Sequence, residues 1–185
     1  MECAEIAVAV LAAGQARRFG SDKLMVALDD APLGAHIART LSPIGFGWRF
    51  AVCAGGAPIA GPYAALGFTT IENLQPETGQ AHSLHLAVAA AQATRAKALL
   101  ITLADMPYVT PAHIEGIMRA GGLVASFDGV SAMPPALFPR DTWPGLLRTA
   151  GDAGARELLL QATHVMASSD ILRDIDTRAD LPASK

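Results

Sequence analysis

The stretch that decides the fold is Ile6–Lys23, which reads I-A-V-A-V-L-A-A-G-Q-A-R-R-F-G-S-D-K. Its first part, Ile6–Ala13, is a continuous apolar run that is too short for a typical helix and ends at Gly14, so we expect a strand buried on both faces. The following loop contains two arginines, two glycines and a lysine. Glycines let the backbone approach a ligand closely, while free N–H groups with Arg18 and Lys23 attract anionic oxygens. The loop is therefore a candidate phosphate site, although a solvated strand-to-helix turn has the same composition.

Two well-known phosphate motifs do not describe this loop. A Walker loop needs Gly-Lys-Ser/Thr together, and here Lys23 is followed by Leu24. The dinucleotide fingerprint needs G-x-G-x-x-G, and here Gly14 is followed by Gln15-Ala16. We therefore do not expect a nicotinamide-dependent oxidoreductase.

Length and composition indicate one well-packed domain spanning residues 1–185. Hydrophobic residues make up 51% of the chain and charged residues only 17%, which argues against a disordered protein. The formal net charge is −3, so no overall positive field attracts nucleic acid, and phosphate binding has to be local.

The compartment is predicted from the cysteines and the N-terminus. Two cysteines, Cys3 and Cys53, are too few for a disulfide framework and suit a reducing cytoplasm. The start of the chain is acidic and its first apolar run is short, so we expect no signal peptide. Apolar runs are too short for a membrane helix, and we expect a cytoplasmic protein without a membrane partner.

Strands and helices are predicted to alternate through the first two-thirds of the chain. The expected strands after the first are Trp48–Ala54, Phe68–Ile71 and Ala98–Ala104; the expected helices contain Leu33–Leu41, Leu84–Ala96 with Ser83 as a plausible N-cap, and the segment from Pro111. Alternation of this kind predicts a mainly parallel, Rossmann-like sheet with helices on both faces, a three-layer α/β/α fold.

The last third of the chain is expected to be less regular. We expect short strands at Leu123–Ala125 and Ser131–Met133, with Pro134-Pro135 breaking the chain after them. Short helices follow, one of them after Gly151–Gly154, and Val165–Ala167 is predicted to be an edge strand.

Asp105 is the second residue that indicates chemistry. It follows the buried strand from Ala98, so it is expected at the same carboxyl edge of the sheet as Gly14, where sheets of this class bind ligands. A carboxylate there can hold Mg²⁺ beside a nucleotide, since Mg²⁺ takes one or two carboxylates plus phosphates and water. A helix-capping or loop aspartate is the alternative interpretation.

Four segments together resemble one family. Leu11-Ala12-Ala13-Gly14-x₃-Arg18-x-Gly20-x₂-Lys23 resembles the signature loop of the sugar-nucleotide-type nucleotidyltransferases. Leu103–Pro107, L-A-D-M-P, resembles the metal-binding turn of their MobA-like branch, and Asp174–Leu181 resembles the closing motif of that branch. Gly151-Asp152-x-Gly154-Ala155-Arg156, after Pro135-x-Leu137-Phe138, is similar to the molybdenum cofactor cytidylyltransferase subgroup.

This resemblance implies roles for particular residues and the nucleotide-diphospho-sugar transferase fold. Leu11 and the backbone of Ala12–Gly14 would meet the nucleotide, and Arg18 and Lys23 would neutralise its triphosphate. Asp105 would bind Mg²⁺, the implied cofactor. Asp176, which precedes Thr177, is the preferred second ligand over Asp174, and both aspartates remain open to interpretation as exposed turn residues.

Recognition of the base is assigned to the first loop and to the segment before the alanine-rich helix. Gln80 and Ser83 of that segment are candidates to hydrogen-bond the base, Ser83 also being a candidate N-cap. The Ala-Ala-Gly form at residues 12–14 resembles cytidine-using enzymes, whereas guanosine-using relatives carry Ala-Gly-Gly. CTP is therefore the expected substrate, with GTP as the alternative.

The resemblance implies nucleotidyl transfer to a phosphorylated acceptor with release of pyrophosphate. The implied acceptor is the molybdenum cofactor, molybdopterin, with a molybdoenzyme or its chaperone as a further partner. One departure leaves the acceptor open, because the segment Phe127–Pro134 is shorter than in cytidylyltransferase relatives. A sugar or methylerythritol phosphate is an alternative acceptor, and a non-catalytic protein that binds and delivers molybdopterin is the alternative of another class.

Overall fold

A seven-stranded sheet forms the centre of the protein, whose computed structural model describes residues 1–14, 22–151 and 154–182. The strand order is β5 (Thr69–Asn73), β4 (Trp48–Ala54), β1 (Ile6–Ala12), β6 (Ala98–Leu103), β8 (Ala132–Pro139), β7 (Val124–Phe127) and β9 (Thr163–Met166). Neighbours are parallel except for the two pairs that β8 makes with β6 and β7. The predicted mainly parallel sheet is confirmed.

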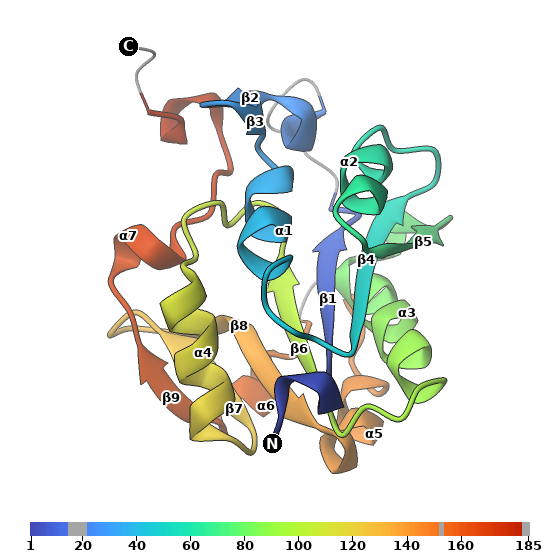
Figure 1. The fold of residues 1–185 in the computed structure, drawn as a ribbon, viewed down its shortest axis with the longest axis vertical. Helices are drawn as coiled ribbons and strands as arrows, with labels where there is room; N and C mark the ends of the chain where they lie inside the picture. The colour runs from blue at the N-terminus through green and yellow to red at the C-terminus, as the bar shows by residue number, and fades with distance from the viewer. Residues whose placement is uncertain (15–21, 152–153, 183–185) are drawn as a thin grey trace.

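Helices cover both faces of this sheet, which makes the predicted three layers (Figure 1). One face carries α1 (Ala35–Leu41), α2 (Ala60–Ala65), α4 (Pro111–Ala120) and α7 (Ser169–Leu172); the other carries α3 (Gln80–Gln92), α5 (Trp143–Leu146) and α6 (Arg156–Leu159). All seven residues of β1 are buried, with Val8 and Val10 in one core and Ala7 and Ala9 in the other. Burial on both faces explains why this strand is apolar without alternation.

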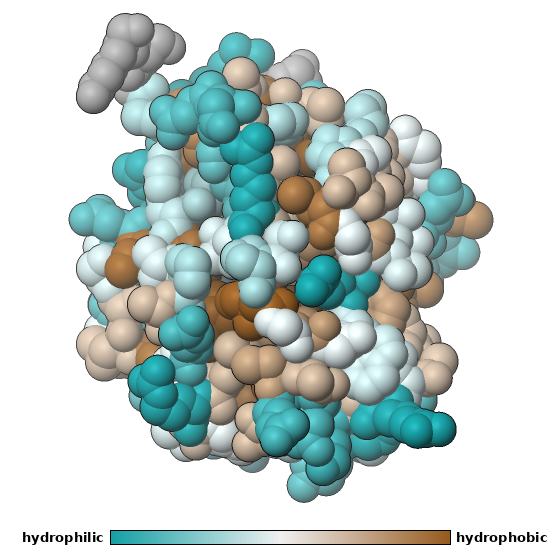
Figure 2. Space-filling view, in the orientation of Figure 1, coloured by the Kyte–Doolittle hydropathy of each residue, from teal (hydrophilic) through white to brown (hydrophobic). Residues whose placement is uncertain are grey.

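The remaining elements are short. A two-stranded hairpin is formed by β2 (Ala27–Leu28) and β3 (Ala31–Pro32). Short 3₁₀ helices span Cys3–Glu5, Lys23–Met25, Pro76–Thr78, Arg140–Thr142 and Arg178–Asp180. Among the described residues, no helix has the length and apolar character needed to cross a bilayer. On the face that carries α1 and α4, polar side chains predominate at both ends of the molecule and small apolar areas lie between them (Figure 2).

The start of α3 differs from the prediction. The helix begins at Gln80, and the cap position belongs to Gly79, whose φ of 100° is a backbone conformation that favours glycine. Ser83 lies inside the helix, buried, and its hydroxyl accepts a hydrogen bond of 2.9 Å from Nδ2 of Asn73. Ser83 as an N-cap is therefore wrong, because the left-handed glycine lets the helix start one turn earlier.

The proline pair does not break the chain as expected. Strand β8 runs through Pro134 and Pro135, whose shared peptide bond is cis. The pairing of β8 with β7 passes from Ala136 opposite Ala125 to Met133 opposite Ser126, so both prolines lie in an irregularity of the ladder. Neither proline has to donate a ladder hydrogen bond, which is why the strand tolerates them.

Candidate functional site

The carboxyl ends of β1 and β6 lie side by side at one edge of the sheet. Leu11 is paired with Leu103, and the amide of Ala104 donates a hydrogen bond of 3.1 Å to the carbonyl of Leu11. Gly14 and Asp105 follow these strands directly. Gly14 and Asp105 therefore follow strands that end at the same edge of the sheet, as expected.

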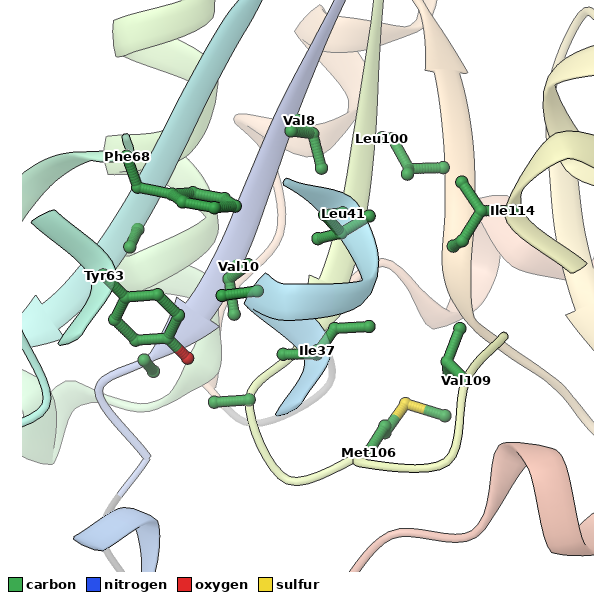
Figure 3. Close-up of a cluster of buried hydrophobic side chains, with 14 of the residues drawn as sticks. Val8, Val10, Ile37, Leu41, Tyr63, Phe68, Leu100, Met106, Val109 and Ile114 are labelled. Carbon is green, nitrogen blue, oxygen red and sulfur yellow. The ribbon is translucent and has the colours of Figure 1, made fainter. Parts of the chain in front are cut away.

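Asp105 stands on a turn that the core holds in place. Met106 and Val109, both 2% exposed, follow it and point toward α1, where Ile37 belongs to the same cluster (Figure 3). Burial of two large apolar side chains on this loop anchors its backbone, since each contributes about 1.5–3 kcal/mol relative to exposure. The carboxylate of Asp105 is thereby fixed at the sheet edge.

Lys23 joins two carboxylates from distant parts of the chain. Its Nζ lies 3.0 Å from Oδ2 of Asp105 and 3.0 Å from Oδ1 of Asp176. Lys23 opens the 3₁₀ helix Lys23–Met25, whose first turn is capped by the side chain of Asp22, and only 8% of the residue is exposed. A lysine is rarely buried unless it is paired, so both contacts belong to one structural unit.

The C-terminal tail brings Asp176 to this position. The amide of the preceding Ile175 donates a hydrogen bond of 3.0 Å to the backbone carbonyl of Asp105, and the Ile175 side chain is fully buried. Behind it, Oδ2 of Asp180 accepts hydrogen bonds from the amides of Asp176 and Thr177 and from the Thr177 hydroxyl. These bonds lower the pKa of Asp180, and they hold the tail as a closed turn.

The titration behaviour of the cluster follows from its charges. Burial by itself lowers the pKa of Lys23, but the nearby Asp105 and Asp176 outweigh it, so the pKa of this lysine is raised. The pKa of Asp174 is also raised, first by loss of hydration and then by the carboxylates of Asp176 and Asp105. The structure therefore pairs Asp176, rather than Asp174, with Lys23.

The donor set at this point fits a magnesium ion that completes its shell with substrate oxygens. Within residues 1–14, 22–151 and 154–182, no group of three or more His, Cys, Asp and Glu side chains is placed to hold a metal. Asp105 and Asp176 nevertheless converge on one cation, the ammonium of Lys23, and Oδ1 of Asp105 is buried without a hydrogen-bond partner among the described residues. Mg²⁺ uses one or two carboxylates plus phosphate and water oxygens.

A cavity of about 320 Å³ opens beside the cluster, on the α3 side of the sheet. Its lining is mostly apolar and comes from β1, α3, β6, β8 and the segment around α6: Leu11, Gln80, Leu84, Ile101, Leu103, Ala132, Met133, Pro134, Phe138, Gly154, Ala155, Arg156 and Leu159. Arg156 is the one charged side chain among these described lining residues. Leu103 of the lining lies two positions before Asp105 in the chain.

Gln80 and Gly154 lie next to each other in the lining of this cavity. Gly154 has a φ of 53°, and a Cβ added there would lie 2.6 Å from Oε1 of Gln80. A side chain at position 154 is thus disfavoured by the backbone conformation and would require the side chain of Gln80 to move. The pair shapes the polar end of an otherwise apolar cavity.

Only some of the other residues expected to bind nucleotide line the cavity. Leu11 and Gln80 line the cavity, Ala12 and Ala13 are buried, and Gly14 is exposed. Ser83 is buried outside the cavity lining. Arg18 lies outside the described residues. The sequence did not predict that Arg156 would line a cavity, since this residue was considered only as the end of the motif Gly151–Arg156.

Residues 8–165 match the MobA-like NTP transferase domain, from the first strand to β9. The chain belongs to this family. The match covers the strands of the sheet that lead to the site described above.

Three similar proteins illustrate the likeness. The purine catabolism protein PucB of Bacillus subtilis is 32% identical over 184 residues, covering 90% of this chain and 89% of PucB. A nucleotidyl transferase from Methanothermobacter has the same fold with a TM-score of 0.79 and 20% identity, over 95% of this chain and 93% of that one. Rv0371c of Mycobacterium tuberculosis, solved in complex with manganese, has a TM-score of 0.74 and 23% identity, over 95% and 94%.

Proposed function

We propose that this MobA-like nucleotidyltransferase transfers CMP from CTP to the phosphate of a molybdopterin acceptor in a Mg²⁺-dependent reaction that releases pyrophosphate. The observation that carries the proposal is the convergence of Asp105 and Asp176 on a single cation, with Nζ of Lys23 3.0 Å from each carboxylate. A cation site at the carboxyl edge of a parallel sheet, beside a substrate-sized cavity, is suited to phosphate chemistry.

The reaction is an in-line displacement at phosphorus. An oxygen of the acceptor phosphate forms a bond to the α-phosphorus of CTP, and the bond from that phosphorus to the bridging oxygen of the β-phosphate breaks. The electron pair leaves with pyrophosphate, so no covalent intermediate with the protein is required. The contribution of the protein is alignment and charge stabilisation.

Each charged residue of the cluster has its own role in this reaction. Lys23, together with Arg18, neutralises the triphosphate and the charge that grows on departing pyrophosphate. Asp105 and Asp176 hold Mg²⁺, which when bound supplies a Lewis acid for the phosphate oxygens. The buried backbone of Ala12 and Ala13 supports the loop that meets the nucleotide.

The cavity is proposed to receive the acceptor. Its apolar walls suit a flat heterocycle, and Arg156 is a natural partner for an anionic group. Molybdopterin, which carries both a heterocycle and a phosphate, meets these requirements, and the similarity of Gly151–Arg156 to the cytidylyltransferase subgroup supports it. We propose a molybdoenzyme or its chaperone as the protein that receives the product.

CTP is proposed as the nucleotide because of Ala13. A thermal-shift panel of CTP, GTP, ATP and UTP with Mg²⁺ tests this assignment, since a ligand that binds only the folded state raises its stability. We expect the largest shift with CTP. A larger shift with GTP would reassign the base and leave the reaction class unchanged.

An assay of pyrophosphate release from CTP, in the presence of Mg²⁺ and molybdopterin, distinguishes catalysis from binding alone. An enzyme releases pyrophosphate in proportion to acceptor consumed, whereas a carrier that only binds and delivers molybdopterin releases none. A sugar phosphate and methylerythritol phosphate belong in the same assay as alternative acceptors. Release with one of these and not with molybdopterin would reassign the acceptor.

We propose that the reaction takes place in the cytoplasm. Cys3 and Cys53 are both free thiols, as expected for a protein of a reducing compartment. Burial raises the pKa of Cys53 to about 11, so this thiol is unreactive in the folded protein.

A further inference from the structure

The position of Lys23 has a consequence for metal binding, because the lysine lies where a metal would be held. Its ammonium is 3.0 Å from an oxygen of Asp105 and 3.0 Å from an oxygen of Asp176, while the residue is only 8% exposed. The pair of carboxylates proposed to bind Mg²⁺ is therefore already neutralised in part by a buried cation of the protein itself.

The charges of the cluster disfavour a metal ion that arrives alone. Asp105, Asp176 and the ammonium of Lys23 together carry a single negative charge, and the carboxyl group of Asp174 interacts electrostatically with all three. A divalent ion bound by the oxygens of Asp105 and Asp176 would lie within a few ångströms of the ammonium. Repulsion at such distances is strong where water is partly excluded, since the effective dielectric constant there is about 20 rather than 80.

A triphosphate removes this conflict. Its oxygens supply several negative charges beside the cluster, and a lysine side chain is a flexible four-carbon stem that can turn from the carboxylates to a phosphate. The two carboxylates are then free for the metal, and the buried Oδ1 of Asp105, which has no hydrogen-bond partner among the described residues, would be available to coordinate it.

We propose that Lys23 acts as an internal counter-cation that keeps the divalent metal out of the Asp105–Asp176 site until a nucleotide draws the lysine away. The proposal rests on the proposed function, because it takes both aspartates as metal ligands. It assigns Lys23 a second role besides neutralising the triphosphate, that of making metal binding depend on nucleotide. Metal and nucleotide then enter together, and the nucleotide-free protein does not store the metal.

The test is a titration of the full-length protein with Mn²⁺ in the absence of nucleotide, followed by electron paramagnetic resonance of free Mn²⁺. Lys23→Met removes the charge and keeps an unbranched, apolar side chain in a buried position. We expect this variant to bind Mn²⁺ about tenfold or more tightly than the unchanged protein, the scale on which one neighbouring charge alters the affinity of a carboxylate for a proton. Equal or weaker binding by Lys23→Met would overturn the proposal.

Two further variants serve as controls. Lys23→Arg retains the charge and is expected to bind Mn²⁺ no more tightly than the unchanged protein. Lys97 pairs with Glu5, and the two residues directly precede β6 and β1, at the opposite edge of the sheet from Lys23. Lys97→Met is also expected to leave the Mn²⁺ affinity unchanged. A gain in Lys97→Met equal to that in Lys23→Met would assign the effect to net charge and overturn the proposal.

Folding of Lys23→Met has to be established independently, because the change leaves two carboxylates without their cation. Mn²⁺ itself provides the readout, since tighter binding to the folded state raises the melting temperature of Lys23→Met more than that of the unchanged protein. An absence of this excess shift would contradict the proposal even if the variant is destabilised.

A separate measurement distinguishes failure of this proposal from failure of the proposed function. Water-proton relaxation of the Mn²⁺·CTP complex rises when the complex binds the protein. Binding of Mn²⁺·CTP that Asp105→Asn abolishes, together with no gain of Mn²⁺ affinity in Lys23→Met, would reject the counter-cation and retain the metal site. Binding of neither Mn²⁺ nor Mn²⁺·CTP by any variant would reject both.

Discussion

The amide of Ile175 donates a 3.0 Å hydrogen bond to the backbone carbonyl of Asp105, and so ties the C-terminal tail to the turn that follows β6. The two residues are far apart in the sequence, and this contact brings the next residue of the tail, Asp176, to within reach of Lys23. The second carboxylate of the site is therefore supplied by the tail through a backbone bond.

The first prediction distinguishes the two tail aspartates. Asp176→Asn is expected to lower kcat about a hundredfold, the scale for loss of one group that stabilises transition-state charge, because Asp176 contacts the shared cation. Asp174→Asn, the matched control two residues earlier, is expected to change kcat by less than about threefold, since the pKa of Asp174 is raised and it forms no described ion pair with Lys23. Steady-state pyrophosphate release measures both, and a larger loss in Asp174→Asn would exchange their roles.

The second prediction concerns the glycine that faces Gln80. Gly154→Ala and Gly151→Ala both place alanine at a positive φ, 53° and 60°, so both are expected to lose about 1–2 kcal/mol of unfolding free energy. The added methyl of Gly154→Ala would in addition lie 2.6 Å from Oε1 of Gln80, whereas at Gly151 it would meet no described atom within 4 Å.

Only Gly154→Ala is therefore expected to raise a substrate KM, because Gln80 has to move within the cavity. Denaturant unfolding establishes that the two variants are equally destabilised, and initial rates give KM. Equal KM values in the two variants would show that the contact between Gly154 and Gln80 has no part in binding.

The third prediction concerns Arg156, the charged residue of the cavity lining. Arg156→Ala is expected to raise the KM of a phosphorylated acceptor about tenfold or more, since a hydrogen bond to a charged group contributes about 1.5–3 kcal/mol. The affinity for CTP should stay unchanged. Arg148→Ala, which removes an exposed arginine outside the cavity lining, is the control and should leave both constants unaltered. An equal loss of affinity for CTP in Arg156→Ala would place this arginine on the nucleotide instead.

The fourth prediction is a pH dependence of stability from His113. This residue is 8% exposed, its Nε2 lies 2.8 Å from the hydroxyl of Ser126, and that hydroxyl donates a 2.8 Å hydrogen bond to the carbonyl of Pro135. Because the Ser126 hydroxyl already donates its hydrogen to Pro135, it accepts a hydrogen bond from Nε2–H of His113. Burial lowers the pKa of His113 below its ordinary value of 6.5.

Because the unfolded chain takes up a proton at a higher pH than the folded protein, the contribution of His113 to stability is complete above pH 6.5 and declines as the pH falls toward the lower folded-state pKa. Urea unfolding between about pH 7.5 and pH 5.5 is expected to show a steeper decline for the unchanged protein than for His113→Gln. Parallel curves would contradict this assignment.

The strands that the sequence predicts best are those whose buried residues form a continuous apolar run. Trp48–Ala54 agrees with β4 at both ends, and Ile6–Ala13 differs from β1 by one residue, because all of β1 and the middle of β4 are buried and apolar. The start of α3 was missed because the backbone of Gly79, rather than the side chain of Ser83, caps the helix. The course of β8 through two prolines depends on a ladder irregularity that only the pairing with β7 reveals.

The candidate site was also predicted only in part. Lys23, Asp105 and Asp176 were singled out from motifs, but their mutual contacts join residues up to 153 positions apart and depend on how the tail packs. The cavity was not predicted, since its lining is contributed by five separate segments whose packing no local pattern encodes. Expectations that rest on Arg18 remain predictions, because that residue lies outside the described part of the chain.

The most direct test of nucleotidyl transfer follows two phosphorus labels in CTP, one at the α-position and one at the γ-position, with Mg²⁺ and molybdopterin. The account predicts that the α-label appears on the acceptor and the γ-label in pyrophosphate, in equal amounts, and that Asp105→Asn loses both. Recovery of the γ-label on the acceptor or as inorganic phosphate, with the α-label left in the nucleotide diphosphate, would contradict it.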